Sequence, residues 1–190
     1  MEANALLATA VSTLEELVGG TRPDQLNDPT PCAKWTVHDL LNHVVGGGHM
    51  FAMGFRGDPM PDVHGDVPDL LGDDPQEALK AALADFDDGI RSPGAMDRMI
   101  SLPVGDIPAP VAVQLASFDL LVHCWDLATA TGQALNISDE ALAAADAAAH
   151  MLIAPEYRDG DTFGAEVTVP DTATSLQRFV AFTGRDPLSR

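Results

Sequence analysis

The sequence predicts an all-α protein, an antiparallel four-helix bundle with short additional helices towards the C-terminus. Three observations carry this prediction. The 190 residues suit a single domain. Aromatic residues make up only 5% of the chain, so alanine and leucine, both strong helix formers, supply much of the core. Apolar residues also recur at three-and-four spacing in four long segments. We therefore expect one domain over residues 1–190, with the bundle over about 1–153 and an extension over 154–190.

The first helix is expected over residues 3–17, where the apolar positions follow the helical period. Gly19 and Gly20 follow directly and are expected to stop it. Residues 22–35 contain three prolines and are expected to form a loop.

The second helix is expected to begin after Thr36, a suitable N-cap, with Asp39 in the third position of a capping box. Three glycines at residues 46–48 would normally end a helix. The apolar pattern nevertheless resumes and runs to Met53. We expect the helix to continue through the glycines, whose missing side chains leave room for another backbone or a ligand.

The later elements show first-turn prolines, N-cap hydroxyls and terminal glycines. They are expected as a loop over 58–74, a helix over 75–90, a loop over 92–107 with an extended piece at 99–102, and helices over 110–131, 139–153 and 174–183. Apart from that extended piece, no strand is expected.

The charge of the chain excludes two classes of partner. It carries 29 acidic residues against 10 basic ones, a formal net charge of −19. Nucleic acids and anionic membrane surfaces repel such a protein, because both are bound through clustered lysine and arginine. We therefore expect neither nucleic acid nor membrane as a partner, and a well-solvated acidic surface.

The sequence also points to the cytoplasm. The N-terminus lacks the basic region of a secretory signal, and no apolar run is long enough to cross a bilayer. Cys32 and Cys124 are the only cysteines, too few for a disulfide framework. A cytoplasmic protein with reduced thiols is expected.

Three side chains are candidates for a metal site. Asp119 and His123 lie four residues apart, on one face of the fourth helix, and His43 lies among apolar residues of the second. Two imidazoles and one carboxylate suit zinc or nickel, and three protein ligands leave a position open for water or substrate. The pattern alone leaves two other interpretations open, an exposed surface pair and a hydrogen-bonded core histidine.

Two segments of the chain resemble a known family. Its signatures are matched here by PTPC at residues 29–32, WTV at 35–37, DLLNHVVGG at 39–47, DLLVHCWDLA at 119–128 and TG at 131–132. They resemble the DinB-like superfamily, in the branch of the metal-binding N-terminal domain of mycothiol-dependent maleylpyruvate isomerase. FG at 163–164, VP at 169–170 and GRDP at 184–187 also fit this branch, so the resemblance spans nearly the whole chain.

The resemblance implies a four-helix bundle in which one histidine and an acidic-x-x-x-His pair hold a metal ion. Those positions correspond to His43, Asp119 and His123. The isomerase-like members have glutamate where this chain has Asp119, one methylene shorter. This departure puts the ligand reach, the metal preference and a shared substrate in doubt.

Three neighbours of these residues are candidates for supporting roles. Asp39 could orient His43, although the helix-cap role is favoured. Asp126 could accept a hydrogen bond from a ligand histidine, and an ordinary surface aspartate is equally compatible with the sequence. His49 lies about 120° around the helix from His43, so it shares the metal only if the glycines break the helix.

Five further side chains have simpler expected roles. Cys124 should be a buried apolar residue, and Trp35 and Trp125 should anchor the core. Cys32 could be reactive if it meets a helix N-terminus, but packing is the simpler role. His64, in the acidic loop, could cover the site.

We expect a metal-dependent enzyme that activates a thiol of the mycothiol type for isomerisation or for transfer to a small electrophile. Zinc is the first candidate for the metal and nickel the second, with mycothiol as co-substrate. A composition with only two lysines fits a GC-rich, actinobacterial genome. The alternatives are a non-catalytic, metal-dependent binding or stress-response protein, acting as a homodimer, and a plain helical scaffold.

Overall fold

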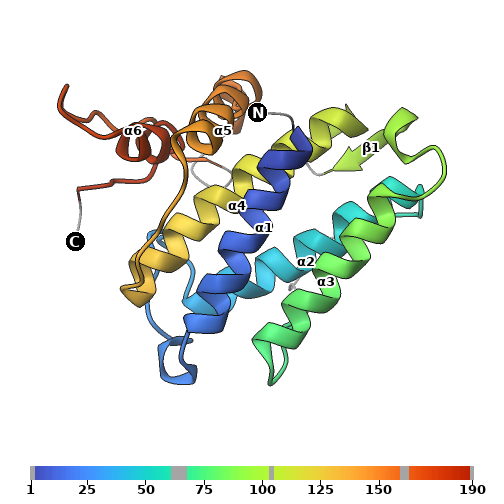
Figure 1. Ribbon diagram of the computed structural model, residues 1–190, viewed down its shortest axis with the longest axis horizontal. Helices are drawn as coiled ribbons and strands as arrows, with labels where there is room; N and C mark the ends of the chain where they lie inside the picture. The colour runs from blue at the N-terminus through green and yellow to red at the C-terminus, as the bar shows by residue number, and fades with distance from the viewer. Residues whose placement is uncertain (1–2, 61–67, 103–104, 159–162, 189–190) are drawn as a thin grey trace.

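A computed structural model describes residues 3–60, 68–102, 105–158 and 163–188 of the chain. Within these residues the fold is mostly helical, as the sequence predicts, with one small sheet (Figure 1). The elements are α1 (Ala3–Gly20), α2 (Val37–Arg56), α3 (Pro75–Ile90), β1 (Met99–Leu102), β2 (Gly105–Pro108), α4 (Ala109–Thr131), α5 (Asp139–Leu152) and α6 (Ser175–Phe182), with 3₁₀ turns at Pro23–Gln25, Ala95–Asp97 and Pro155–Tyr157.

The two-stranded sheet corrects the all-α prediction. β1 is the expected extended piece, and it pairs antiparallel with β2, which lies in a segment predicted as loop. In β1 the buried side chains Ile100 and Leu102 alternate with exposed ones, the period expected of a half-buried strand. In β2 only Ile107 is apolar and Pro108 ends the strand, so the sequence of β2 carries no strand pattern of its own.

The long helices pair in a way that the sequence did not predict. α1 packs along α4, and α2 packs along α3. Within the second pair, Gly48 meets Ala82 and Ala52 meets Gly89, so contacts advance in the same direction along both helices. The expected antiparallel order is therefore wrong for α2 and α3, which run parallel (Figure 1). It is also wrong for α1 and α4, since Cys124 meets Ala10 and Gln133, just after α4, meets Leu17.

The parallel pairing requires the chain to return to the start of α2 before α3 begins. Asn42, in the second turn of α2, holds the returning segment with two hydrogen bonds. Its Nδ2 donates to the carbonyl of Pro68 at 3.0 Å, and its Oδ1 accepts from the amide of Leu70 at 2.7 Å. A buried polar side chain thus fixes where α3 starts relative to α2.

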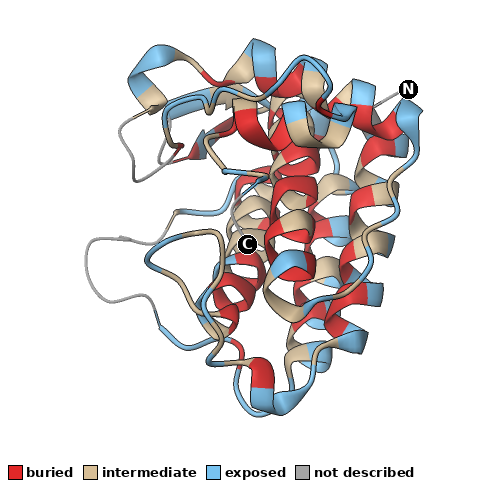
Figure 2. Cartoon of the chain, turned by 90° about the vertical axis from the view of Figure 1, so that its left-hand side faces the viewer, coloured by how far each residue is buried: buried red, intermediate tan, exposed pale blue. Residues whose placement is uncertain are grey.

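The core lies along α4. Buried residues lie on the sides of the helices that face the interior, and exposed residues lie on the outer sides and in the loops (Figure 2). α4 is long and apolar enough to cross a membrane by length and composition, but 67% of that apolar window is buried inside the protein. Its apolar character follows from its position, because its side chains enter all three core clusters.

The helix ends follow local chemistry. α1 continues through Gly19 and Gly20, beyond its predicted end, and Gln133 Nε2 donates to the carbonyl of Leu17 at 2.9 Å there. At the start of α2 the predicted capping box is present. Thr36 Oγ1 accepts from the Asp39 amide at 3.2 Å, and Asp39 Oδ2 accepts from the Thr36 amide at 2.9 Å.

Gly89 of α3 sets the distance between α2 and α3. A Cβ atom at this position would lie 2.8 Å from the Cα of Ala52 and 2.9 Å from its carbonyl oxygen. We expect Gly89→Ala to lower the free energy of unfolding by roughly 1–3 kcal/mol, because the added methyl group would clash with the backbone of Ala52, which cannot move aside as a flexible side chain can. Urea denaturation measures this loss. Gly19→Ala, where nothing lies within 4 Å, is the control and should cause no loss. Equal stability of the two variants would contradict this close packing.

Candidate metal centre

The structure brings His43, Asp119 and His123 together. Asp119 and His123 share one face of α4, and their Oδ2 and Nε2 atoms lie 3.6 Å apart. His43 reaches them from α2, with its ring centroid 5.1 Å from that of His123. One potential ligand atom from each residue lies within 4.8 Å of the other two. Side chains 76 positions apart in sequence therefore converge on one point.

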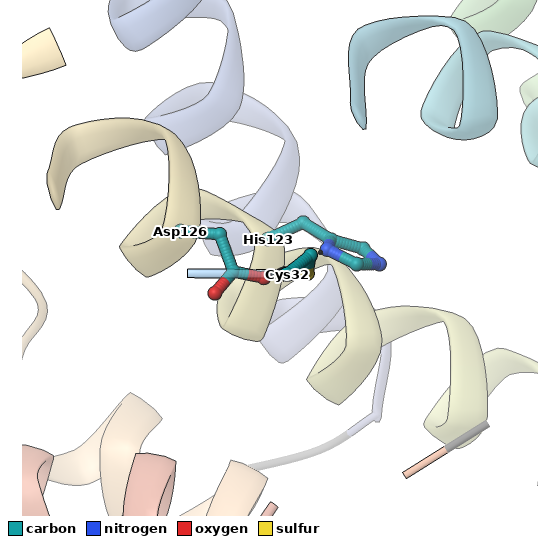
Figure 3. Close-up of side chains that lie close together, drawn as sticks. All are labelled: Cys32, His123 and Asp126. Atoms are coloured by element: carbon teal, nitrogen blue, oxygen red, sulfur yellow. Dashed lines mark hydrogen bonds and ion pairs between the residues drawn. The ribbon is translucent and has the colours of Figure 1, made fainter. Parts of the chain in front are cut away.

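Asp126 holds the ring of His123 from the other side. Its Oδ2 lies 3.1 Å from Nδ1 of His123, one turn along α4 (Figure 3). This contact directs Nε2, the other ring nitrogen, towards Asp119 and His43. Ligand histidines in metalloproteins are commonly oriented by such a carboxylate. Of the two roles that the sequence left open for Asp126, the exposed surface aspartate is excluded, since its side chain is fully buried.

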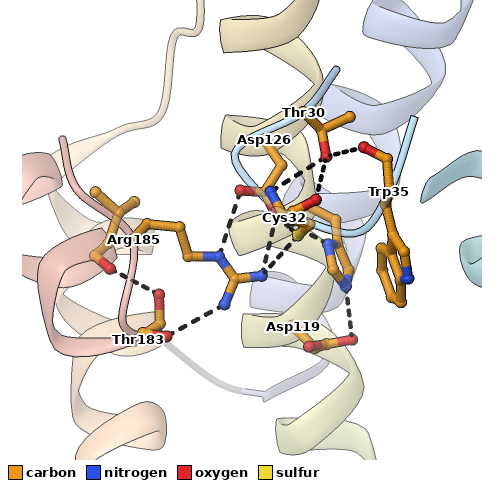
Figure 4. Close-up of polar contacts among 9 residues, drawn as sticks. Thr30, Cys32, Trp35, Asp119, Asp126, Thr183 and Arg185 are labelled. Carbon is orange, nitrogen blue, oxygen red and sulfur yellow. Dashed lines mark hydrogen bonds and ion pairs between the residues drawn. The ribbon is translucent and has the colours of Figure 1, made fainter. Parts of the chain in front are cut away.

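A buried ion pair extends from Asp126 to the C-terminal segment. Arg185 Nη2 and Nε donate to the two Asp126 oxygens at 3.0 and 3.3 Å (Figure 4). Cys32 joins this network from the loop before α2. Its Sγ lies 3.2 Å from Asp126 Oδ2, and Arg185 Nη2 donates to the sulfur at 3.4 Å. Asp126 thus contacts His123 on its own helix and two side chains from distant parts of the chain, Cys32 and Arg185.

Arg185 decides between two possible donor sets. Among the described residues, Cys32, His123 and Asp126 also place ligand atoms within 4.8 Å of one another. The guanidinium of Arg185 already contacts two of these three side chains, and it would repel a second cation placed between them. His43, Asp119 and His123 are therefore the better donor set, and the Cys32 cluster supports it.

The electrostatics favour positive charge at His123. Desolvation of the buried ring lowers its pKa, but the charge of Asp119 and the hydrogen bond to Asp126 outweigh this and raise the pKa of His123 well above its usual range. For Asp126, desolvation raises the pKa, but the hydrogen bond from His123 and the charge of Arg185 bring it well below its usual range. The carboxylates stabilise a cation here, either a proton or, on Nε2, a metal ion.

The neutral form is favoured at His43, in contrast to His123. Its side chain is exposed where it borders the cavity, yet protein encloses the ring on the remaining sides. This desolvation, followed by repulsion from His123, lowers the pKa of His43 to about 4. A neutral imidazole has a free lone pair, the form in which histidine binds a metal.

The three residues border a cavity of about 590 Å³ between α2, α3 and α4. Trp35 forms part of its wall, with its ring centroid 4.6 Å from that of His43 and 5.9 Å from that of His123. Trp35 packs against the core, as the sequence predicted, but its side chain is only half-buried and also lines the cavity.

The glycines of α2 have the two roles that the sequence allowed. The helix runs through residues 46–48 without a break. Gly48 packs on α3, where an added Cβ would lie 3.2 Å from the Cβ of Ala82. Gly47 lines the cavity, and an added Cβ there would meet nothing within 4 Å. Gly48 therefore allows α3 to pack closely, and Gly47 leaves open space in the cavity.

The other candidates lie elsewhere. Asp39 belongs to the capping box of α2, the role favoured from the sequence. His49 Nδ1 lies 2.7 Å from Asp85 Oδ2 on α3, and the unbroken helix keeps it on a different face from His43. Cys124 is fully buried, as expected, and desolvation raises the pKa of its thiol. His64 lies outside the described residues.

Sequence reasoning did not find the role of Arg185. It lies in the GRDP segment at residues 184–187, which the resemblance includes, but no local pattern connects it to α4. The one signal available was chemical, because this chain has few cations and any buried carboxylate needs one. Cys32 was expected to have a packing role, and the structure adds two polar contacts to it.

The fold and the site together define a mostly helical protein with a candidate three-ligand metal centre between its helices. The sequence model of the mycothiol maleylpyruvate isomerase N-terminal domain matches residues 7–128. The chain belongs to this family, which is part of the DinB-like superfamily.

Two similar proteins come from Mycobacterium tuberculosis, an actinobacterium. They are the uncharacterized proteins Rv0738 of strain H37Rv and MT0763 of strain CDC 1551. Each is 35% identical to this chain over 170 residues, which cover 89% of this chain and 90% of the relative. No solved structure matches the chain significantly.

Proposed function

We propose that this protein binds one divalent metal ion through His43, Asp119 and His123 and uses it to activate a thiol of the mycothiol class. The observation that carries the proposal is the convergence of three ligand atoms within 4.8 Å at the border of a cavity. Zinc is the expected ion and nickel the alternative, since both accept two imidazoles and a carboxylate.

The donor set fits such an ion in three respects. The ligands come from two helices that lie side by side, in agreement with the four-helix bundle inferred for α1–α4. His123 is oriented by a buried carboxylate. Asp119 and His43 are open to the cavity, so a small molecule can reach the fourth position. Three protein ligands with one open position are typical of catalytic rather than structural zinc sites.

Thiol chemistry is the reaction class that this site supports best. A divalent ion lowers the pKa of a bound thiol and so supplies a thiolate at neutral pH. The protein contributes the rest: Asp126 and Arg185 hold His123 in place, and Trp35 shields His43. We expect the thiolate to form a C–S bond with a small electrophile. In isomerisation this bond would break again and return the thiol, and in transfer it would remain while a leaving group departs or the adduct takes up the proton released by the thiol. The family is named for a mycothiol-dependent isomerase domain, which supports the choice of thiol.

The shorter Asp119 separates this chain from the isomerase-like members, so we propose the metal-thiol chemistry without their substrate. We also propose a cytoplasmic location, where low-molecular-weight thiols stay reduced.

Elemental analysis of protein purified without a histidine tag tests the metal centre. We expect about one zinc or nickel ion per chain. Metal together with turnover in an assay of thiols against small electrophiles would support the full proposal. Metal without turnover would favour a non-catalytic binding or stress-response protein, for which the oligomeric state should be measured as well. Absence of metal from protein refolded with excess zinc would leave only a helical scaffold.

A further inference from the structure

The cavity at the candidate metal centre continues well past the three ligands. On α4 it follows Leu115 and Ala116, one turn before Asp119. On α2 it follows Gly47 and Phe51, one and two turns beyond His43. Because α2 and α4 run in opposite directions, both sets of residues lead away from the ligands towards the same end of the molecule, where the β-hairpin lies.

This part of the cavity, the apolar arm, is lined by hydrophobic side chains from four elements. They are Phe51 of α2, Leu79, Leu83 and Phe86 of α3, Leu102 of β1 and Leu115 of α4. Phe51 and Phe86 meet edge to face, with ring centroids 5.8 Å apart, and so form a fixed wall. Phe51, Leu83 and Leu115 are only partly buried, because they border open space.

The ionisable side chains of the cavity lie at its other end, around the proposed metal ligands. Among the described residues that line the cavity, the ionisable ones are Cys32, Lys34, His43, Asp119, His123 and Arg185. All of them are either the proposed metal ligands or lie in the loop before α2 and the C-terminal segment, and Arg185 is already neutralised by Asp126. A charged group placed in the apolar arm would lose its hydration without gaining a partner.

The length of the arm follows from helix geometry. The eight residue steps from His43 to Phe51 correspond to about 12 Å along α2, and the seven from Leu79, level with the ligands, to Phe86 correspond to about 10 Å along α3. Gly47 keeps the passage between the ligands and the arm open, because it has no side chain to fill it. A Cβ atom added at this position would meet no other atom within 4 Å. A methyl-sized substrate would leave most of this space unused.

We propose that the apolar arm binds the elongated hydrophobic body of the substrate, about 10–12 Å long, while its polar head lies at His43, Asp119 and His123. The placement of the head rests on the proposed function, and the binding of the body does not. The arm therefore selects a neutral or singly charged molecule with a long apolar chain. It disfavours a small dianion, whose second charge would lie among Phe51, Phe86 and Leu102.

A series of alkyl hydroxamates of increasing chain length tests this proposal by calorimetry. The hydroxamate head chelates a divalent ion, and the chain probes the arm. Each methylene that enters the arm should tighten binding about fourfold, which corresponds to about 0.8 kcal/mol per buried methylene. The gain should continue from acetohydroxamate through hexanohydroxamate to octanohydroxamate. The same series is measured on metal-free protein, where binding should be weaker but the dependence on chain length should remain.

Gly47→Leu places a side chain at the entrance of the arm, and Gly19→Leu is its matched control. Both glycines are helical, and an added Cβ meets nothing within 4 Å at either, but Gly19 lies near the end of α1 away from the cavity. Gly47→Leu should remove most of the gain from octanohydroxamate, and Gly47→Ala should remove part of it. Gly19→Leu should behave as the unmodified protein. The metal content of each variant is measured in parallel.

The outcomes separate the two proposals. Acetohydroxamate binding with no further gain from longer chains would overturn the apolar arm and leave the metal centre intact. A chain-length dependence in protein that takes up no zinc or nickel, even when either ion is supplied in excess, would support the arm and overturn the metal centre. An undiminished octanohydroxamate gain in Gly47→Leu would show that the chains bind elsewhere, and would also overturn the proposal.

Discussion

Replacing His123 by alanine is expected to reduce the bound divalent metal from about one ion per chain to near zero. The Nε2 atom of His123 lies 3.6 Å from Asp119 Oδ2. Of the two candidate histidine ligands, His123 is the one whose ring contacts a buried carboxylate. Without it, one imidazole and one carboxylate remain, too few for tight binding of zinc. Thiol-dependent turnover should be lost with the metal. Elemental analysis after gel filtration measures the first effect and a thiol-consumption assay the second.

Two further variants keep this test independent of folding. His123 is buried, so its removal also disturbs the core. His43 borders the cavity, and His43→Ala should lose the metal while the circular dichroism spectrum and the urea midpoint match those of the metal-free unmodified protein. His38→Ala on the same helix is the control, because its side chain lies 3.6 Å from exposed Asp69, and it should retain the metal. Full metal content in folded His43→Ala and His123→Ala would refute the three-ligand site.

Asp126→Asn is expected to lower the free energy of unfolding by about 3–5 kcal/mol, the loss typical when one partner of a buried ion pair is removed. The Asp126 side chain is fully buried and that of Arg185 is 11% exposed, so water cannot replace the lost charge. The metal affinity should also fall roughly 10- to 100-fold, since His123 loses the partner that orients it. Urea denaturation of metal-free protein measures the stability, and competition with a chelator measures the affinity.

A double variant separates the ion pair from general damage. Asp126→Asn combined with Arg185→Gln should be more stable than Asp126→Asn alone, because it leaves no uncompensated charge in the core. Asp87→Asn is the surface control. Its ion pair with Arg91 is more than half exposed on both sides, and its loss should leave the stability nearly unchanged. Equal effects of Asp126→Asn and Asp87→Asn would contradict the role assigned to Arg185.

The helices and the ligand pair on α4 were accessible from the sequence because both depend on short-range spacing. Apolar periodicity together with helix-end residues predicted the six helices, and α3 begins and ends where expected. The spacing of Asp119 and His123 placed them on one face, but only the resemblance added His43. β2 and the parallel pairing of α2 with α3 were missed, since each is set by a partner elsewhere in the chain.

The residues that support the site were harder to predict, because Arg185 and Cys32 reach Asp126 from distant parts of the chain. Asp126 was left open between an acceptor and a surface residue, and its burial depends on a cation 59 positions away. Cys32 lies 94 positions from the carboxylate that it contacts. No periodicity links such residues. The apolar arm could not be predicted either. The sequence indicated only that the glycines at residues 46–48 leave room for another backbone or a ligand.

The parallel pairing of α1 with α4 has a consequence for the order of folding. Cys124 of α4 meets the carbonyl of Ala10 across 114 positions, and Arg185 meets Cys32 across 153. Such contacts form only after long chain segments have closed, which slows folding and delays the contacts they join. We therefore expect α2 and α3 to associate first and the ligand cluster to assemble last. During synthesis, a chain that has not yet emerged from the ribosome as far as Arg185 would lack the contacts of Arg185 with Asp126 and Cys32. We expect such a chain to bind the metal only weakly.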